Sequence, residues 1–417
     1  MTESGRGGGE DRTFPAGKMS RFLACGILPA FRRRNTLQDK VCLAASARAK
    51  SKIIKQKIHP TNKLKNKKTE SNQHTIINQK RDHQMALYIP EGYKSCLTTR
   101  QTQIAIKKVK DFFERDLSIQ LNLTRVSAPI FVGSGSGLND TLNGFERPVG
   151  FSIHSGEEFE IVQSLAKWKR MALRDYGFAV GEGLYTDMNA IRRDEETDNI
   201  HSMFVDQWDW EKVIRASDRN IFTLKAAVKN IYNALKHTEN FIADDYNFID
   251  RLLPEKITFV SAQELEDEYP ELTPKEREYQ AVREYGAVFV MGIGGDLRSG
   301  KPHDGRAPDY DDWSLNGDII VYYPVLDIPL ELSSMGIRVN RESLKQQLDI
   351  RGCTERLSLP FHSELMAGHL PYTIGGGIGQ SRICMFFLRK AHIGEVQSSF
   401  WKPAEAAECA RRGVKLL

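Results

Sequence analysis

The chain has 417 residues, of which 40% are hydrophobic, so it is long enough to bury a substantial core in two or three domains. No stretch approaches the roughly 18 uncharged apolar residues that a membrane helix needs, which excludes a protein that spans a membrane by helices. The six cysteines include no Cys-x-x-Cys pair, which argues against a zinc ribbon or a dithiol redox site and favours a reducing, cytoplasmic setting.

The net charge of +5 is unevenly distributed. Residues 1–84 carry 19 Lys and Arg against 6 Asp and Glu, a net +13, so the remaining residues carry −8. This first segment has almost no hydrophobic periodicity, which is typical of chains that cannot build a packed core. We interpret it as a basic, disordered extension without a catalytic role. The alternatives are a nucleic-acid-binding arm, an organellar targeting segment, and upstream sequence joined to the domain by gene prediction.

Signals of ordered structure begin at Met85, so we predict one folded domain at residues 85–400 and a divergent tail at residues 401–417. Apolar spacing and capping residues predict helices that begin at Thr98 and that cover residues 165–177, 218–246, 273–286, 344–348 and 383–388. Strands are expected at residues 125–132, 159–164, 189–196, 202–213, 287–294, 317–326 and 329–339. Because strands and helices do not alternate regularly, we predict an α+β fold with a mixed, mainly antiparallel sheet flanked by helices.

Two of these strands place polar side chains on one face. Residues two apart in a strand share a face, so Gln207 and Asp209 lie together, with Trp208 and its neighbours on the opposite face. The same alternation pairs Glu331 with Ser333. A carboxylate beside an amide or a hydroxyl on a buried face is costly unless a polar ligand binds there, and a solvent-facing strand is the alternative.

Clusters of charge suggest a site for phosphate and metal. The segment "HDGRAPDYDDWSLNGD" surrounds Arg306 with five aspartates, which are Asp304, Asp309, Asp311, Asp312 and Asp318. Such a cluster can hold a hydrated magnesium ion and the phosphates that it bridges, although a solvated acidic loop is the commoner case. Cationic side chains stand elsewhere at Lys167, Lys169, Arg170, Arg192, Arg193 and Arg382. Taken together, these charges favour a nucleotide site with magnesium.

The glycine-rich segment "TIGGGIGQSRICMFF", residues 373–387, fits neither common phosphate-binding template. A P-loop ends in Gly-Lys-Ser/Thr, whereas Gly379 is followed by Gln380, and a dinucleotide fingerprint requires a glycine where Gln380 stands. We expect a glycine loop that leads into a final helix with Arg382 in its first turn. An arginine beside the free N–H groups of a helix start suits a phosphate or a nucleotide ring.

Over residues 85–397 the chain resembles the ammonia-dependent asparagine synthetases, which are built on the catalytic fold of class II aminoacyl-tRNA synthetases. The matching stretches are "SLAKWKR", "GEGLYTDMNAIRRDE", "VDQWDWE", "RAPDYDDW", "LNGDI", "ELSSMGIRV" and "TIGGGIGQSR". The resemblance implies that ATP and L-aspartate form a β-aspartyl adenylate and pyrophosphate, and that ammonia then yields L-asparagine and AMP. It also implies magnesium and a homodimer, without a membrane or tRNA partner.

The resemblance further implies roles for individual residues. Asp140 would hold the substrate amino group and is a candidate to take the proton from ammonium. Arg338 would pair with the α-carboxylate of aspartate. Arg192 would pair with the α-phosphate of ATP, and Glu195 would lie near its adenine. The implied substrate-binding set is Asp140, Ser164, Lys169, Gln207, Asp209, Ser333, Ser334 and Arg338. The implied ATP-binding set is Lys169, Arg192, Glu195, Arg306, Asp311, Gly377, Gly379 and Arg382. The implied magnesium ligands are Asp318 and Glu331. The implied catalytic residues are Asp140, Arg192 and Gln207.

Three other functions compete with this one. An aspartyl- or asparaginyl-tRNA synthetase shares the adenylation chemistry, but residues 1–84 have too few alternating apolar strands for an anticodon-binding barrel. A glutamine-dependent asparagine synthetase needs an N-terminal cysteine nucleophile, and this sequence begins Met-Thr. A catalytically silent paralogue, serving as a regulatory or RNA-binding protein, is disfavoured because all the expected polar positions are present.

Deletion of residues 1–84 should leave ATP consumption unchanged, because the extension contributes no candidate site residue. Steady-state rates of the full-length and truncated chains, compared at equal concentration, check this expectation. A truncated chain that is folded by circular dichroism but no longer consumes ATP would show that the extension belongs to the enzyme.

Overall fold

A computed structural model describes residues 87–142 and 146–417 of the chain. The basic extension that was predicted at residues 1–84 lies outside these ranges, as does the predicted start of the domain at Met85, so both stay predictions. No helix within the described ranges is long and apolar enough to cross a membrane.

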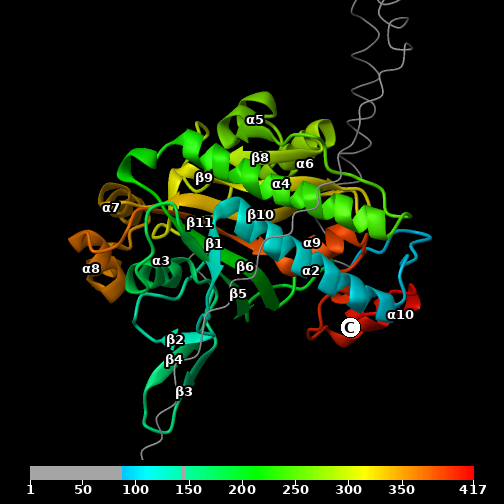
Figure 1. The fold of residues 1–417 in the computed structure, drawn as a ribbon, viewed down its shortest axis with the longest axis horizontal. Helices are drawn as coiled ribbons and strands as arrows, with labels where there is room; N and C mark the ends of the chain where they lie inside the picture. The colour runs from blue at the N-terminus through cyan, green and yellow to red at the C-terminus, as the bar shows by residue number, and fades with distance from the viewer. Residues whose placement is uncertain (1–86, 143–145) are drawn as a thin grey trace, which may run out of the picture. The chain divides into compact units, whose positions relative to one another are not determined.

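The centre of the fold is an eight-stranded mixed sheet (Figure 1). In spatial order its strands are β1 (Leu123–Arg125), β5 (Gly183–Ile191), β6 (Phe204–Val213), β11 (Thr373–Gly379), β10 (Ile328–Arg338), β9 (Asp311–Tyr323), β8 (Ala287–Met291) and β7 (Thr258–Ser261). The edge pairs β1–β5 and β7–β8 are parallel, and the pairs between them are antiparallel. The prediction of a mainly antiparallel mixed sheet is therefore confirmed.

One face of the sheet is covered by α2 (Thr99–Leu121), α4 (Ile221–Asp245) and α9 (Gln380–Phe387). In Figure 1, α2 and α4 lie side by side across the strands. The main core lies between these helices and the sheet, and it contains Trp208 and Trp210 of β6. Because strand residues alternate between faces, Gln207 and Asp209 point away from this core, as predicted.

Other helices pack elsewhere around the sheet. The helix α3 (Ala166–Asp175) contacts β5, β6 and β11, while α5 (Ala262–Glu268) and α6 (Pro274–Tyr285) pack near β7, β8 and β9. The helices α7 (Arg341–Ile350) and α8 (Pro360–Ala367), with the short helix η2 (Thr354–Ser358), form a satellite core, and α10 (Pro403–Arg411) lies near the C-terminus. A small sheet has the order β2 (Phe131–Gly133), β4 (Glu158–Ile161), β3 (Gly150–Ser152). Two further short helices are η1 (Ala216–Asp218) and η3 (Ile393–Glu395).

Each of the six predicted helices is present, and the capping residues fix where two of them begin. Thr98 accepts a hydrogen bond from the N–H of Gln101 and forms the predicted capping box at the start of α2. Thr273 does the same for α6, with Pro274 in the first turn. These interactions are local, which is why the sequence was sufficient to place them.

The strand predicted at residues 125–132 is wrong, because the structure has two strands there in different sheets. The strand β1 ends at Arg125 in the large sheet, and β2 begins at Phe131 in the small one. Pro129 stands between them, and proline has no N–H with which to continue a ladder. The strand predicted at residues 317–326 also begins earlier than expected, because β9 starts at Asp311.

The expected glycine loop at residue 373 is instead a central strand, β11, paired with β6 and β10. Its glycines make room for side chains of the neighbouring strand. A Cβ atom at Gly375 would lie 2.0 Å from Oε2 of Glu211, and one at Gly377 would lie 2.4 Å from Oε1 of Gln207. Such distances are far below van der Waals contact, so other residues would displace these polar side chains.

The segment predicted to be a divergent tail packs against the main core. Trp401, Cys409 and Val414 are buried members of it, and α10 lies between the first and last of them. The N–H of Leu417 donates to the carbonyl oxygen of Gly394 at 2.8 Å, which ties the end of the chain to the segment before the tail. Residues 401–417 are therefore part of the folded unit.

Candidate active site

A polar cavity of about 350 Å³ opens beside the face of the sheet that carries Gln207 and Asp209. Its walls come from β6, β9, β10 and β11, from the first turn of α9, and from the loop at residues 192–203 that joins β5 to β6. We call residues 192–203 the β5–β6 loop. The cavity brings together residues that are far apart in the sequence, from Asp140 to Gln397.

Most of the residues to which the resemblance gives a substrate, ATP, metal or catalytic role line this one cavity. Those that do so are Asp140, Ser164, Arg192, Glu195, Gln207, Asp209, Arg306, Asp311, Asp318, Glu331, Ser334, Arg338, Gly377, Gly379 and Arg382. Lys169 and Ser333 are placed elsewhere. The substrate, ATP and metal roles of these residues stay predictions, but their convergence makes a single site of them.

The predicted pairing of Glu331 with Ser333 on one face is wrong because β10 contains a bulge. The register against β9 shifts between these two residues, with Glu331 opposite Ile320 and Ser333 opposite Ile319. A bulge reverses the face on which the following residues lie. Ser334 therefore lies opposite Asp318 and lines the cavity together with Glu331, whereas Ser333 is buried outside the cavity.

Lys169 lies beneath the cavity in a network of buried charges, which also contains Asp209, Glu211, Asp311 and Arg338. Its ammonium group donates to Asp209, to the carbonyl oxygen of Trp210 at 3.0 Å and to that of Gly376 at 3.2 Å. These three acceptors use its three N–H groups, so Lys169 holds Asp209 in place and has no donor left for a ligand. Burial lowers the pKa of Lys169, and the Asp209 carboxylate opposes that shift. We call this set the buried charge network.

Arg338 joins the other members of the buried charge network. Its Nε and Nη2 atoms donate to Glu211 at 3.0 and 2.7 Å, and Nη1 donates to Asp311. The Glu211 and Asp311 carboxylates raise the pKa of Arg338, although burial alone would lower that pKa. Three of its five N–H groups are thus used by the protein, and one on each terminal nitrogen remains for a ligand in the cavity.

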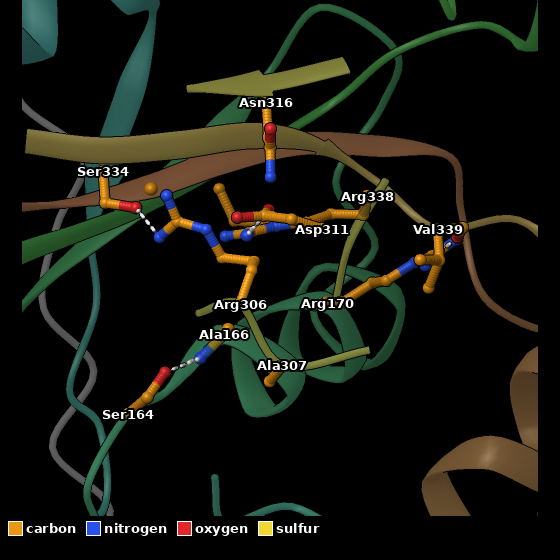
Figure 2. Close-up of polar contacts among 12 residues, drawn as sticks. Ser164, Ala166, Arg170, Arg306, Ala307, Asp311, Asn316, Ser334, Arg338 and Val339 are labelled. Atoms are coloured by element: carbon orange, nitrogen blue, oxygen red, sulfur yellow. Dashed lines mark hydrogen bonds and ion pairs between the residues drawn. The ribbon is translucent and has the colours of Figure 1, made fainter. Parts of the chain in front are cut away.

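Arg306 spans β9 and β10 at another wall of the cavity. Figure 2 shows its guanidinium group reaching Ser334, with Asp311 and Arg338 beside it. Its Nη2 atom donates to Oδ1 of Asp318 at 2.7 Å. Burial and, to a smaller extent, the nearby Glu331 raise the pKa of Asp318 to about 6, although Arg306 opposes both effects. The carboxylate is therefore held by one cation and one hydroxyl but remains costly to ionise.

Asp318 and Glu331 are the two carboxylates that could hold magnesium. No group of three or more His, Cys, Asp or Glu side chains among the described residues is arranged to hold a metal ion by itself. Magnesium, however, commonly takes one or two carboxylates and completes its shell with phosphate oxygens and water. Two carboxylates lining a cavity of this size fit that kind of site.

Three buried charged atoms at the cavity have no hydrogen-bond partner among the described residues. They are Oδ2 of Asp140, Nε of Arg192 and Nε of Arg306. Burial raises the pKa of Asp140 to about 6, and the positive charge of Lys167 opposes this shift. Because buried polar atoms are nearly always paired, this set is suited to a ligand that carries both a cationic group and anionic groups.

A second cluster supports the segment that carries Asp140. Oδ2 of Asp309 is 3.2 Å from Nζ of Lys167, 3.0 Å from Nε2 of His362 and 3.2 Å from Nη1 of Arg356. These cations and hydrogen bonds hold the pKa of Asp309 well below its usual range, although burial by itself would raise that pKa. The Nη2 atom of Arg356 also donates to Oγ1 of Thr141 at 3.3 Å, next to Asp140.

Sequence reasoning missed several residues of the cavity wall. His201 lines it, and Nδ1 of this ring is 2.9 Å from Oδ2 of Asp198, three residues earlier. Tyr310, Ile393 and Gln397 line it as well. The Asp-x-x-His spacing and the tyrosine inside "RAPDYDDW" were visible signals for two of them, whereas Ile393 and Gln397 reach the site through the folding of the C-terminal segment.

A family model described as aspartate–ammonia ligase matches residues 100–413. The chain belongs to the aspartate–ammonia ligase family. It is 62% identical over 333 residues to the aspartate–ammonia ligase of Clostridium perfringens strain 13, covering 79% of this chain and 99% of that protein. It is 60% identical over 334 residues to that of Ruminiclostridium cellulolyticum, covering 80% and 99%. The prediction of a ligase of this family is confirmed.

Comparison with solved structures identifies the fold of this member of the aspartate–ammonia ligase family. Asparaginyl-tRNA synthetase of Entamoeba histolytica in complex with asparaginyl-adenylate matches with a TM-score of 0.53 at 13% identity, over 73% of this chain and 68% of that one. The Pyrococcus horikoshii enzyme complexed with asparaginyl-adenylate gives 0.53 at 15%, over 71% and 68%. The predicted class II synthetase catalytic fold is confirmed.

Replacing Lys169 by methionine should lower the free energy of unfolding by about 3–5 kcal/mol, because it strands the buried Asp209 carboxylate without its cation. Lys107→Met is the matched control, since Lys107 pairs with Asp111 on the exposed surface and should cost less than about 1 kcal/mol. Urea unfolding of both variants measures the difference. Equal losses would mean that the buried charge network does not stabilise the fold.

Proposed function

We propose that the protein synthesises L-asparagine from L-aspartate and ammonia, using ATP and releasing AMP and pyrophosphate through a β-aspartyl adenylate. The observation that carries this proposal is the set of unpartnered charges at one cavity: a buried carboxylate, Asp140, together with the guanidinium nitrogens of Arg192 and Arg306. The ammonium group of an amino acid would pair with the carboxylate of Asp140. The phosphate oxygens of ATP would pair with the guanidinium groups of Arg192 and Arg306.

In this proposal the amino acid lies over β6. Asp140 accepts the α-ammonium group, and the remaining N–H groups of Arg338 bind the α-carboxylate. Gln207, Asp209, Ser164 and Ser334 surround the side chain of the substrate. Because Asp209 and Arg338 are held by the buried charge network, their positions are fixed before the substrate arrives, which lowers the entropic cost of orienting it.

The nucleotide lies toward the β5–β6 loop and α9. Arg192 neutralises charge at the α-phosphate, Glu195 faces the adenine, and Arg382 stands at the start of α9, where its Nη1 atom donates to the carbonyl oxygen of Glu331 at 3.1 Å. Arg306 and Asp311 line the wall between the two substrates, and Gly377 and Gly379 keep that part of the wall free of side chains. Magnesium bound at Asp318 and Glu331 would neutralise phosphate charge.

The β-carboxylate of aspartate is a poor electrophile at neutral pH, so it must be activated before ammonia can attack it. One of its oxygens attacks the α-phosphorus of ATP, and pyrophosphate leaves. Ammonia then attacks the activated carboxyl carbon, AMP leaves with the electrons of the carbon–oxygen bond, and the nitrogen loses one proton to give the neutral amide. The protein's contribution is to align the carboxylate with the phosphorus and to stabilise the charge that develops there. A homodimer, a cytoplasmic location and the lack of a tRNA partner stay predictions from the sequence.

The direct test incubates the purified protein with ATP, magnesium and aspartate, and measures AMP and asparagine with and without ammonium. Asparagine and AMP that appear together, depend on ammonium and need no glutamine support the proposal. Exchange of pyrophosphate into ATP without any asparagine would overturn it and would make tRNA the next acceptor to test.

Aspartate binding should weaken as the pH falls through about 6. The pKa of Asp140 is raised by burial to about 6, so below that pH the carboxyl is protonated and no longer attracts an ammonium group. Dissociation constants for aspartate between about pH 5 and 8 measure the effect. Asp140→Asn should bind aspartate weakly at every pH, and a variant that keeps the wild-type pH dependence would assign that dependence to another group.

Arg192→Ala should reduce the rate of pyrophosphate exchange by about 100- to 1000-fold, because it removes a preorganised donor at the α-phosphate. Arg193→Ala is the matched control, since Arg193 is the exposed neighbour in the same loop and does not line the cavity. Circular dichroism confirms that both variants fold. Near-wild-type exchange by folded Arg192→Ala would remove Arg192 from the mechanism.

A further inference from the structure

The β5–β6 loop contributes five residues to the cavity wall, and its conformation is held from outside the site. The five residues are Arg192, Glu195, Ile200, His201 and Ser202. The loop has no regular secondary structure of its own, because β5 ends at Ile191 and β6 begins at Phe204. The position of these side chains therefore depends on what the loop is bonded to.

Part of that support comes from Arg147, whose backbone N–H, Nε and Nη2 donate to the carboxylate of Asp194, and much of the rest comes from the C-terminal segment at residues 391–405. The N–H of Ile393 donates to the carbonyl oxygen of Asn199 at 2.8 Å, and Nδ2 of Asn199 donates to the carbonyl oxygen of Ala391 at 2.7 Å. Oγ of Ser202 is 2.8 Å from Oγ of Ser399. The loop is thus fixed near its end by a segment that lies about 200 residues later in the sequence.

The remaining contact is made by Glu405, in the first turn of α10. Its Oε2 atom accepts a hydrogen bond from Oγ1 of Thr197 at 3.0 Å, and its Oε1 atom lies 3.2 Å from Nε2 of His392. The Nδ1 atom of His392 accepts from the N–H of Gly394 at 3.0 Å, so the ring proton is on Nε2 and points at Glu405. Both oxygens of this carboxylate therefore have fixed donors, and its side chain is only 9% exposed.

Thr197 lies two residues after Glu195 and five after Arg192. A shift of Thr197 would move both of the side chains that are proposed to contact the adenine and the α-phosphate. By contrast, Asp140, Asp209 and Arg338, which are proposed to hold aspartate, are supported by the Asp309 cluster and the buried charge network. Apart from the Arg147–Asp194 pair, which joins the loop to the chain near Asp140, the two halves of the site are held by different contacts.

We infer that Glu405 is a positioning residue for the nucleotide: through Thr197 it holds the β5–β6 loop in the conformation that binds ATP, and α10 thereby belongs to the active-site architecture. The inference rests on the proposed function only in taking ATP as the ligand of this loop.

Two variants break the contact from opposite ends. Thr197→Val removes the hydroxyl while keeping the shape of the side chain. Glu405→Gln keeps the shape of the side chain but replaces the carboxylate by a neutral amide, so that Thr197 loses its hydrogen bond to a charged group. Glu408→Gln is the matched control, because it lies on the same helix and pairs with Arg411 and Arg412 at the exposed surface.

We expect Thr197→Val to weaken magnesium–ATP binding by about 5- to 10-fold, as befits the loss of one hydrogen bond to a charged group. Glu405→Gln should weaken it by a smaller factor, because a neutral hydrogen bond between the amide and the Thr197 hydroxyl can remain. The dissociation constant for aspartate, titrated without ATP, should stay within about twofold, and the double variant should bind ATP no more weakly than the weaker single one, because both changes act on the same interaction. Isothermal titration with magnesium–ATP, without aspartate or ammonium, gives the dissociation constants, and thermal unfolding gives the melting temperatures.

A merely structural role for Glu405 predicts a different result. Melting temperatures would fall while ATP affinity stayed at the wild-type value, or ATP and aspartate would weaken in parallel, and either result overturns the inference. The test is independent of turnover: wild-type protein that binds ATP but forms no asparagine would overturn the proposed function, whereas the comparison of ATP affinities would still decide the role of Glu405.

Discussion

The pairing of Arg338 with Glu211 and Asp311 is the interaction on which the rest of the site depends. All three side chains are nearly or fully buried, and removing Arg338 would take from both carboxylates the cation that they share, in a medium of low dielectric constant. Lys169 extends the same network to Asp209, and the glycines of β11 leave the space that Glu211 and Gln207 occupy. The strands β6, β9, β10 and β11 are thus locked in register by charge as well as by backbone hydrogen bonds.

This arrangement separates charges that are satisfied by the protein from charges that are left for a ligand. The buried charge network is paired internally and makes the floor of the cavity rigid. Asp140, Arg192 and Arg306 keep unpartnered atoms at its walls, where complementary charges of an amino acid and a nucleotide can complete them. Such a site is preorganised, because folding already fixes the positions of the groups that would bind the ligand. Binding then only has to supply partners for the unpaired atoms at the cavity wall.

The two halves of the site are held by different parts of the chain. The proposed aspartate side rests on the sheet and on the Asp309 cluster, while the β5–β6 loop rests on residues 391–405. Through the contact of Glu405 with Thr197, a C-terminal helix that contributes no side chain to the cavity wall supports the nucleotide side of the site, and Cys409 packs the same helix into the main core.

The sequence by itself determined the features that depend on near neighbours in the chain. Capping residues placed the starts of α2 and α6, alternation placed Gln207 and Asp209 on one face of β6, and long matching stretches indicated the class II fold and the family. Only the tertiary structure decided which side chains meet across strands. The bulge that replaced Ser333 with Ser334, the burial of Lys169 below the cavity and the contact of Glu405 with Thr197 all depend on partners far away in sequence. Local patterns carry no information about such partners, because strand register and long-range contacts are set by the packing of the whole domain.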